Sequence, residues 1–190
     1  DFYEYTYLKG LGPFRKHENN PILVPQGNEW ESRTVYNPAT WTDGKKVYML
    51  YRAEGPSDVD GKVLSQIGRA ISGDGIHFKR EPQPVLGPTE SYEKPDSCKD
   101  LQKSGCEDPR ITRINDIFYM TYTAYDGEIA RLAMATRLDL RSWEKKRLLF
   151  TDAQWDNYFP RAEYPDTPPG LSKSGVIIPK KVKGWYCMYF

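Results

Sequence analysis

Residues 37–52 read NPATWTDGKKVYMLYR, residues 108–123 read DPRITRINDIFYMTYT, and residues 175–190 read GVIIPKKVKGWYCMYF. In each stretch a short polar turn is followed by an aromatic-rich run. The turns carry Asp43-Gly44, Asn115-Asp116 and Lys183-Gly184. Such pairs supply the tight turns of β-hairpins, and the flanking runs are rich in strand-forming residues. The three stretches therefore predict one hairpin that recurs about every 70 residues.

A second pair of strands is expected after each of the first two hairpins. Residues 68–78 lead to 84–86, and residues 131–143 lead to 148–150. Both segments read as a strand, an Asp-containing turn, an aromatic residue and a second strand. Four strands per repeat are typical of a β-propeller blade, with the extra length in loops 54–65 and 87–104. No segment has a convincing helical period, so the predicted fold class is all-β.

The repeat count predicts an incomplete propeller. At about 70 residues per blade, the 190 residues make under three blades, whereas closure needs at least about four. We therefore expect residues 1–190 to be the N-terminal part of a single β-propeller catalytic domain. The whole chain should have roughly 300–350 residues.

The composition limits the kinds of partner that the protein is expected to bind. The formal net charge is +1, which gives no global field for nucleic acid or an anionic membrane, and no apolar run is long enough to span a bilayer. Aromatic residues make up 14% of the chain, which suits packing between sheets and also stacking on sugar rings. The two histidines and three cysteines predict no zinc site. Free thiols are expected, with a Cys98–Cys106 bridge as the alternative. The compartment stays open between the cytoplasm and the periplasm or secretion.

Polar residues that open each repeat are the candidates for chemistry. The first strand of every propeller blade lines the central channel, so equivalent positions of successive repeats should converge there. These positions hold Asn37, then Glu107, Asp108 and Arg110, then Lys173. They could equally serve as strand caps and turn residues. Two carboxylates beside a guanidinium, however, either pair with each other or are held for a ligand.

Several motifs together resemble glycoside hydrolase family 130. They are GCEDPRI at 105–111, VYNPA at 35–39, YMLYRA at 48–53 and TYTAYDG at 121–127. The resemblance covers about residues 20–190. It implies a five-bladed β-propeller, of which this chain supplies roughly the first three blades. It also implies inverting cleavage of β-mannosides without a metal or organic cofactor, and with inorganic phosphate as co-substrate in the phosphorylases.

The resemblance also implies roles for individual residues. Asp108 matches the family's catalytic aspartate, which donates a proton to the leaving sugar. Arg69 either binds substrate or pairs with a carboxylate of its own blade, and Lys173 is the phosphate ligand if the protein is a phosphorylase. The expected substrate-binding residues are Asn37, Arg52, Arg69, Glu107, Arg110, Tyr125 and Asp126.

Three functions compete on the sequence alone. A β-mannoside hydrolase, with β-1,2 linkages as one option, is favoured slightly over a β-mannoside phosphorylase that releases α-mannose 1-phosphate. The third candidate is a non-catalytic carbohydrate-binding propeller, since a fold does not determine a function. A glutamate pair along the axis would indicate water as the nucleophile, whereas basic residues there would indicate phosphate. The expected partner is a β-mannoside oligosaccharide, and homo-oligomerisation stays open.

Overall fold

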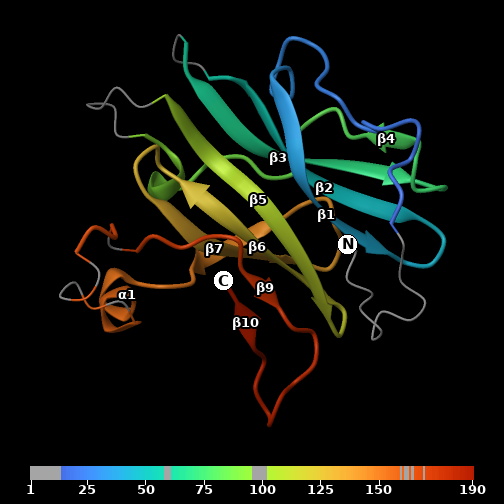
Figure 1. Ribbon diagram of the computed structural model, residues 1–190. Helices are drawn as coiled ribbons and strands as arrows, with labels where there is room; N and C mark the ends of the chain where they lie inside the picture. Colours follow the sequence, from blue (N-terminus) through green and yellow to red (C-terminus); the bar gives the residue numbers. More distant parts are fainter. Residues whose placement is uncertain are drawn as a thin grey trace, which may run out of the picture.

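The computed structural model describes residues 14–57, 61–95, 102–158, 160, 163, 165–168 and 170–190. Its first eight strands form two antiparallel units in chain order, as Figure 1 shows. The first unit, blade 1, comprises β1 (Thr34–Thr42), β2 (Val47–Pro56), β3 (Val63–Ser72) and β4 (Phe78–Arg80). The second, blade 2, comprises β5 (Lys103–Ile114), β6 (Ile117–Tyr125), β7 (Ala130–Arg137) and β8 (Glu144–Leu148). The repeated four-stranded blade is therefore confirmed for the first two repeats.

A short parallel pairing joins the two blades. Val63–Ser65 at the start of β3 pairs with Lys103–Gly105 at the start of β5. The approach is so close that a Cβ atom on Gly105 would lie 2.1 Å from the carbonyl oxygen of Ser65. Gly105 also has a φ of 126°, which side-chain-bearing residues rarely adopt. Only glycine fits this junction, and the junction fixes the register of β5, which carries the GCEDPRI motif.

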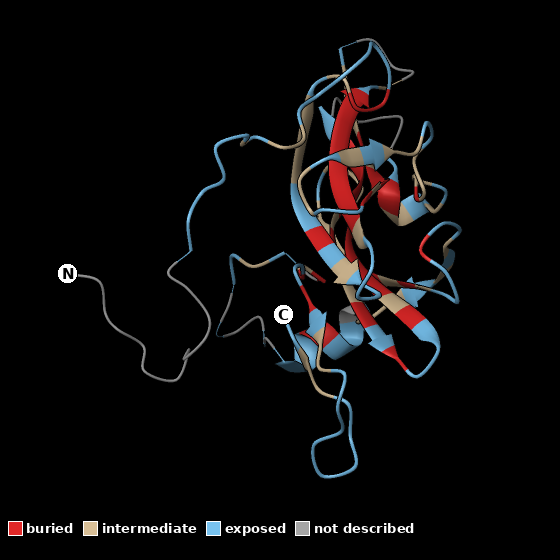
Figure 2. Cartoon of the chain, turned by 90° about the vertical axis from the view of Figure 1, so that its right-hand side faces the viewer, coloured by how far each residue is buried: buried red, intermediate tan, exposed pale blue. Residues whose placement is uncertain are grey.

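The main hydrophobic core lies between the blades. Leu50, Ile67 and Leu86 of the first repeat pack against Met120 and Tyr122 of the second. Figure 2 shows the buried residues concentrated along the strands. Burying such side chains stabilises a fold by roughly 1.5–3 kcal/mol each. Interblade packing therefore holds the two blades in one arrangement.

A buried ion pair reinforces this interface. Glu93, in the 3-10 turn η2 (Ser91–Glu93), is fully buried. Its carboxylate accepts hydrogen bonds from the hydroxyl of Tyr122 at 2.7 Å and from Lys145 of β8. It also accepts the backbone N–H groups of Thr89 and Glu90. The loop that follows blade 1 is thereby anchored to blade 2.

The face of blade 1 that points away from blade 2 is covered by residues that precede β1. Trp30 stacks on Tyr51 with ring centroids 6.3 Å apart. Glu31 accepts hydrogen bonds from the Tyr51 hydroxyl at 2.8 Å and from Arg80 at 2.7 Å. Gly68 lies under these rings, where a Cβ would approach Tyr51 to 2.4 Å. Residues that precede the first hairpin thus complete the packing of this blade.

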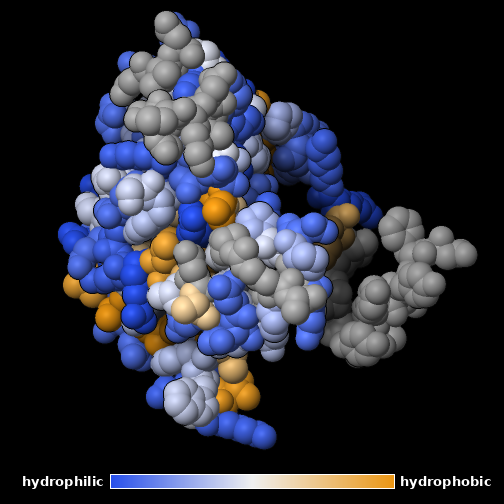
Figure 3. All heavy atoms as spheres, turned by 90° about the vertical axis from the view of Figure 1, so that its left-hand side faces the viewer, coloured by the Kyte–Doolittle hydropathy of each residue, from blue (hydrophilic) through white to orange (hydrophobic). Residues whose placement is uncertain are grey.

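The third repeat forms a short hairpin of β9 (Val176–Ile177) and β10 (Met188–Tyr189). It is anchored to blade 2, since the hydroxyl of Thr121 donates to the carbonyl of Gly175 at 2.5 Å. Its turn is mostly exposed in Figure 2, and Trp185 is 77% exposed. Figure 3 shows hydrophobic side chains in separate groups among hydrophilic ones on the face it displays.

The structure corrects two details of the predicted elements. A helix, α1 (Asp152–Tyr158), forms where none was expected. Trp155 is its one buried residue among those described there. A short helix with a single buried side chain leaves little hydrophobic periodicity in the sequence. The fourth strand of blade 1 is β4, directly after the turn, whereas Leu86 makes only an isolated bridge to Ile67. In blade 2 the fourth strand likewise comes earlier than the expected 148–150, as β8 over Glu144–Leu148. Cys106 and Cys187 are free, and Cys98 lies outside the described residues.

Candidate active site

Equivalent bulges in β1 and β5 position the first two candidate residues. The register of β1 shifts between Tyr36 and Ala39, and that of β5 shifts between Glu107 and Arg110. Inside these bulges Asn37 and Asp108 have φ values of 47° and 48°, and each precedes a proline. Asn and Asp tolerate this left-handed conformation better than most residues, and bulges beside active sites redirect a side chain.

The two redirected side chains meet. Asn37 Nδ2 donates to Asp108 Oδ1 at 2.8 Å, although the residues lie 71 positions apart in the sequence. Asn37 is exposed, and the side chain of Asp108 is 14% exposed. The predicted convergence of the first two repeats is therefore seen directly. Among the described residues, both contacts to the Asp108 carboxylate use Oδ1.

Arg52 lies behind this pair at the centre of a charge cluster. Its Nη2 is 2.7 Å from Glu54 Oε1 and 2.7 Å from Glu107 Oε1, and its Nη1 is 3.3 Å from Asp108 Oδ1. The guanidinium also lies over the ring of Tyr36 at 4.7 Å. Three carboxylates thus share one buried arginine.

The cluster perturbs its two glutamates in opposite directions. Burial raises the pKa of Glu107, and the neighbouring Asp108 raises it further, against the lowering effect of Arg52. Burial also raises the pKa of Glu54, but hydrogen bonds from Tyr36 and Thr34, together with Arg52, bring it down to about 2. Glu54 is therefore firmly ionised. Perturbed carboxyl groups of this kind are typical of functional sites, although structural ion pairs show them too.

The other predicted site residues fall into two groups. Tyr125 pairs with Gly105 at the same end of blade 2 as the cluster, but its hydroxyl donates to the carbonyl of Gly127. Arg110 donates to the carbonyl of Pro109 at 2.8 Å, so the Asp108 partners in the described residues are Asn37 and Arg52.

Asp126, Arg69 and Lys173 are not brought into the cluster by any contact between described residues. Asp126 caps the turn before β7 and pairs with Arg131 at 2.6 Å, which is a structural role. Arg69 pairs with Glu81 at 2.5 Å, which is the alternative foreseen for it within its own blade. Lys173 is exposed in the segment before β9, next to Ser174, which has a φ of 61°.

Sequence reasoning missed three members of the cluster: Tyr36, Glu54 and Ser65. The hydroxyl of Ser65 lies 3.2 Å from Glu107 and 3.4 Å from Glu54, and so links the two glutamates. A signal existed for Glu54, because residues i and i+2 of a strand share a face and Glu54 follows Arg52 at that spacing. Tyr36 directly precedes Asn37, whereas nothing local marked Ser65.

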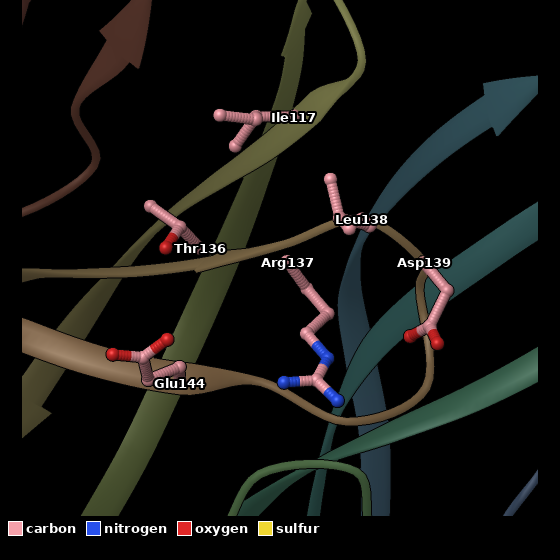
Figure 4. Close-up of a pocket in the computed structure, with 6 residues that line it drawn as sticks. All are labelled: Ile117, Thr136, Arg137, Leu138, Asp139 and Glu144. Carbon is pink, nitrogen blue, oxygen red and sulfur yellow. The ribbon is translucent and has the colours of Figure 1, made fainter.

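A hollow elsewhere in blade 2 is a weaker candidate. It has a volume of about 400 Å³ and is lined by Ile117, Thr136, Arg137, Leu138, Asp139 and Glu144 (Figure 4). Ile117 begins β6 at its hairpin end, whereas Thr123, which pairs with Glu107, lies towards the other end. Asp139 already accepts two backbone N–H groups, and Glu144 pairs with Lys146. These carboxylates serve a turn and a surface pair.

Among the described residues no three His, Cys, Asp or Glu side chains gather as a metal ion would require. The described part of the chain also has no helix long and apolar enough to cross a membrane. Independence from cofactors stays a prediction.

Comparisons with known proteins agree with the fold. The family model for glycoside hydrolase family 130, described as β-1,4-mannooligosaccharide phosphorylase, matches residues 13–190. A 1,2-β-oligomannan phosphorylase of Thermoanaerobacter sp. (strain X514) is 32% identical over 92% of this chain and 52% of its own length. A β-1,2-mannobiose phosphorylase of the same strain is 31% identical over 90% of this chain and 52% of its own. The chain therefore spans about half the length of these relatives.

One solved structure is also similar to this chain in sequence and in fold. It is described as showing that this family of mannoside phosphorylases contains glycoside hydrolases that target β-1,2-mannosidic linkages in Candida mannan. Its sequence is 35% identical to this chain, and the TM-score is 0.73. The match covers 92% of this chain and 52% of the solved one. The expected five-bladed β-propeller is confirmed as the fold class, of which this chain represents about half. The chain belongs to glycoside hydrolase family 130.

Proposed function

We propose that the protein is a β-mannoside phosphorylase that acts on β-1,2-linked manno-oligosaccharides, with Asp108 as the proton donor. The sequence alone slightly favours hydrolysis. Both curated relatives, however, are phosphorylases of β-1,2-mannosides, so phosphorolysis becomes the first candidate and hydrolysis the second. The substrate class of the relatives also supports the expected mannoside partner.

The observation that carries the proposal is the Asn37–Asp108–Arg52 contact. Two redirected backbone positions and a buried arginine hold one carboxylate in place, with its Oδ2 uncontacted among the described residues. Positioning a proton donor in this way is what general acid catalysis requires.

In phosphorolysis an oxygen of inorganic phosphate forms a bond to the anomeric carbon as the glycosidic C–O bond breaks. The proton of Asp108 passes to the leaving sugar oxygen, and the product is mannose 1-phosphate with inverted configuration. The reaction needs no carboxylate as base. In the described cluster the neighbouring carboxylates, Glu54 and Glu107, are both bound to Arg52, which fits a reaction that does not use them as a base.

Asn37 and Arg52 are the residues proposed to contact the sugar beside Asp108. Asn37 is exposed and offers an amide, and a guanidinium suits hydroxyl or phosphate oxygens. Lys173 remains the proposed phosphate ligand. Glu107 is proposed to support Arg52 rather than to meet substrate, because its carboxylate is buried against Arg52 and Ser65.

Hydrolysis is the second candidate. It is favoured by the 35% identity to the solved structure described with β-1,2-mannoside hydrolases. In an inverting hydrolase a second carboxylate about 6.5–9.5 Å from the acid activates water. The two candidates share Asp108 as the acid and differ in the nucleophile.

The test incubates the protein with β-1,2-mannobiose, with and without inorganic phosphate. Phosphate-dependent release of mannose 1-phosphate supports the proposal. Free mannose alone, released without phosphate, establishes hydrolysis instead. Binding without cleavage in either condition establishes a carbohydrate-binding propeller.

Asp108→Asn tests the proton donor. We expect turnover to fall by at least about 10²-fold while substrate binding survives, because the amide keeps the shape of the carboxyl. Asp116→Asn is the matched control, since this aspartate is 90% exposed and pairs with Arg113 at the surface. A stable Asp108→Asn protein with near-normal turnover removes Asp108 from the mechanism.

A further inference from the structure

Glu54 is a buried charge to which the proposed reaction assigns no step. Only 3% of the residue is exposed, and it lies near the end of β2 on the same face as Arg52. Its Oε1 accepts hydrogen bonds from the Tyr36 hydroxyl and from Arg52 Nη2, both at 2.7 Å. Its Oε2 accepts the hydroxyl of Thr34 at 2.9 Å. Burying an ionised carboxylate is costly unless donors surround it, and these donors fix Glu54 in one position.

This fixed carboxylate determines how Arg52 is held. Glu54 and Glu107 both bind Nη2 at 2.7 Å, and the Tyr36 ring covers the guanidinium face. The remaining contact, from Nη1 to Asp108, is longer at 3.3 Å. Charge-assisted hydrogen bonds are usually 2.7–2.9 Å long, so Arg52 is bound tightly by the glutamates and loosely by Asp108.

The long contact between Arg52 and Asp108 has a chemical consequence. A close guanidinium would stabilise the ionised form of Asp108 and oppose the protonated form that a general acid needs. Arg52 carries one positive charge, and Lys103, which is half exposed, lies 3.5 Å from Glu54 Oε2. The negative charge of an ionised Glu54, held beside the same guanidinium, acts against the ionisation of Asp108.

We propose that Glu54 is a positioning residue: by binding Arg52 Nη2, it keeps the guanidinium from closing on Asp108 and so lets Asp108 hold the proton that it donates. This inference rests on the proposed role of Asp108. It makes Glu54 act through Arg52, without contact with the substrate.

The test is Glu54→Gln, which keeps the shape and the oxygen that faces Tyr36 but removes the charge. We expect kcat for β-1,2-mannobiose to fall about 10-fold at neutral pH with little change in KM. The alkaline limb of the pH profile should move about one pH unit lower, the low end of the effect of a neighbouring charge. Glu54→Asp restores the charge with a shorter reach and should recover part of that shift. Tyr36→Phe, which removes one donor to Glu54, should give a smaller shift in the same direction.

Glu81→Gln is the matched control. Glu81 also pairs with an arginine of β3, Arg69, but lies outside the cluster, so its loss should leave the pH profile unchanged. A folded Glu54→Gln protein with the wild-type pH profile overturns the inference. So does a rise in KM alone, because that would mean Glu54 only helps Arg52 to bind substrate.

A second readout separates this inference from the proposed function. The titration of the Asp108 carboxyl can be followed by NMR in the wild type and in Glu54→Gln without turnover. A lower midpoint in the variant supports the inference, and an unchanged midpoint overturns it. If the wild type cleaves no mannoside under any condition, the proposed function fails, and the titration still decides the role of Glu54.

Discussion

Arg52→Met is the most informative test of the charge cluster. Methionine has a similar length but no charge, so the change leaves Glu54, Glu107 and Asp108 facing one another. The Glu54 and Glu107 side chains are only 4% and 11% exposed, and water cannot replace the guanidinium well. Removing one partner of a buried ion pair typically costs about 3–5 kcal/mol in the free energy of unfolding. We expect a loss in this range at pH 7.

The loss should depend on pH in a defined direction. A carboxyl whose pKa is lower in the folded state stabilises the fold above its unfolded pKa, and this contribution disappears as pH falls towards the folded value. For Glu54, the drop of the pKa from 4.5 to about 2 corresponds to about 3 kcal/mol. The hydrogen bonds from Tyr36 and Thr34 lower this pKa most and remain in the variant, so only the part that Arg52 contributes is lost at neutral pH. At pH 4 the uncompensated glutamates take up protons, so the deficit should shrink by about 1–3 kcal/mol.

The assay is urea unfolding of the wild type and the variant at pH 7, 5 and 4. Lys146→Met is the control, because Lys146 and Glu144 form a surface pair with side chains 37% and 63% exposed. Such pairs contribute about 0–1 kcal/mol. A deficit below about 1 kcal/mol for Arg52→Met, or one that does not change with pH, would refute the description of the cluster as a buried network that depends on Arg52.

Two further predictions concern the frame around the site, and thermal unfolding checks both. Gly105→Ala should destabilise the protein by about 2–4 kcal/mol, because the new Cβ meets the Ser65 carbonyl and the φ of this position is unfavourable for alanine. Gly73 has open space around it, so Gly73→Ala should change the free energy of unfolding by no more than about 0.5 kcal/mol. Equal stability of the two variants would show that the blades do not approach as described. Tyr122→Phe should cost about 1–3 kcal/mol, because buried Glu93 loses a donor; an unchanged melting temperature would argue against that bond.

Local patterns in the sequence predicted the framework well. Turn pairs such as Asp43-Gly44 and Asn115-Asp116 determine hairpins within a few residues, so both hairpins of the first two repeats appear where expected. Repetition then predicted that Asn37 and Asp108 would converge, because equivalent positions of stacked blades lie side by side. These inferences need only contacts that are close in the chain or repeated along it.

The partners within the site depended on the three-dimensional structure. Arg52 contacts Asp108 across 56 positions, and Ser65 contacts Glu107 across 42. Arg69, a similar arginine one strand further on, pairs with Glu81 instead. A sequence pattern specifies which face of a strand a side chain occupies but not how far one blade is shifted against the next. That shift is set by the Gly105 junction and the interblade core, and it decides which carboxylates share the buried arginine.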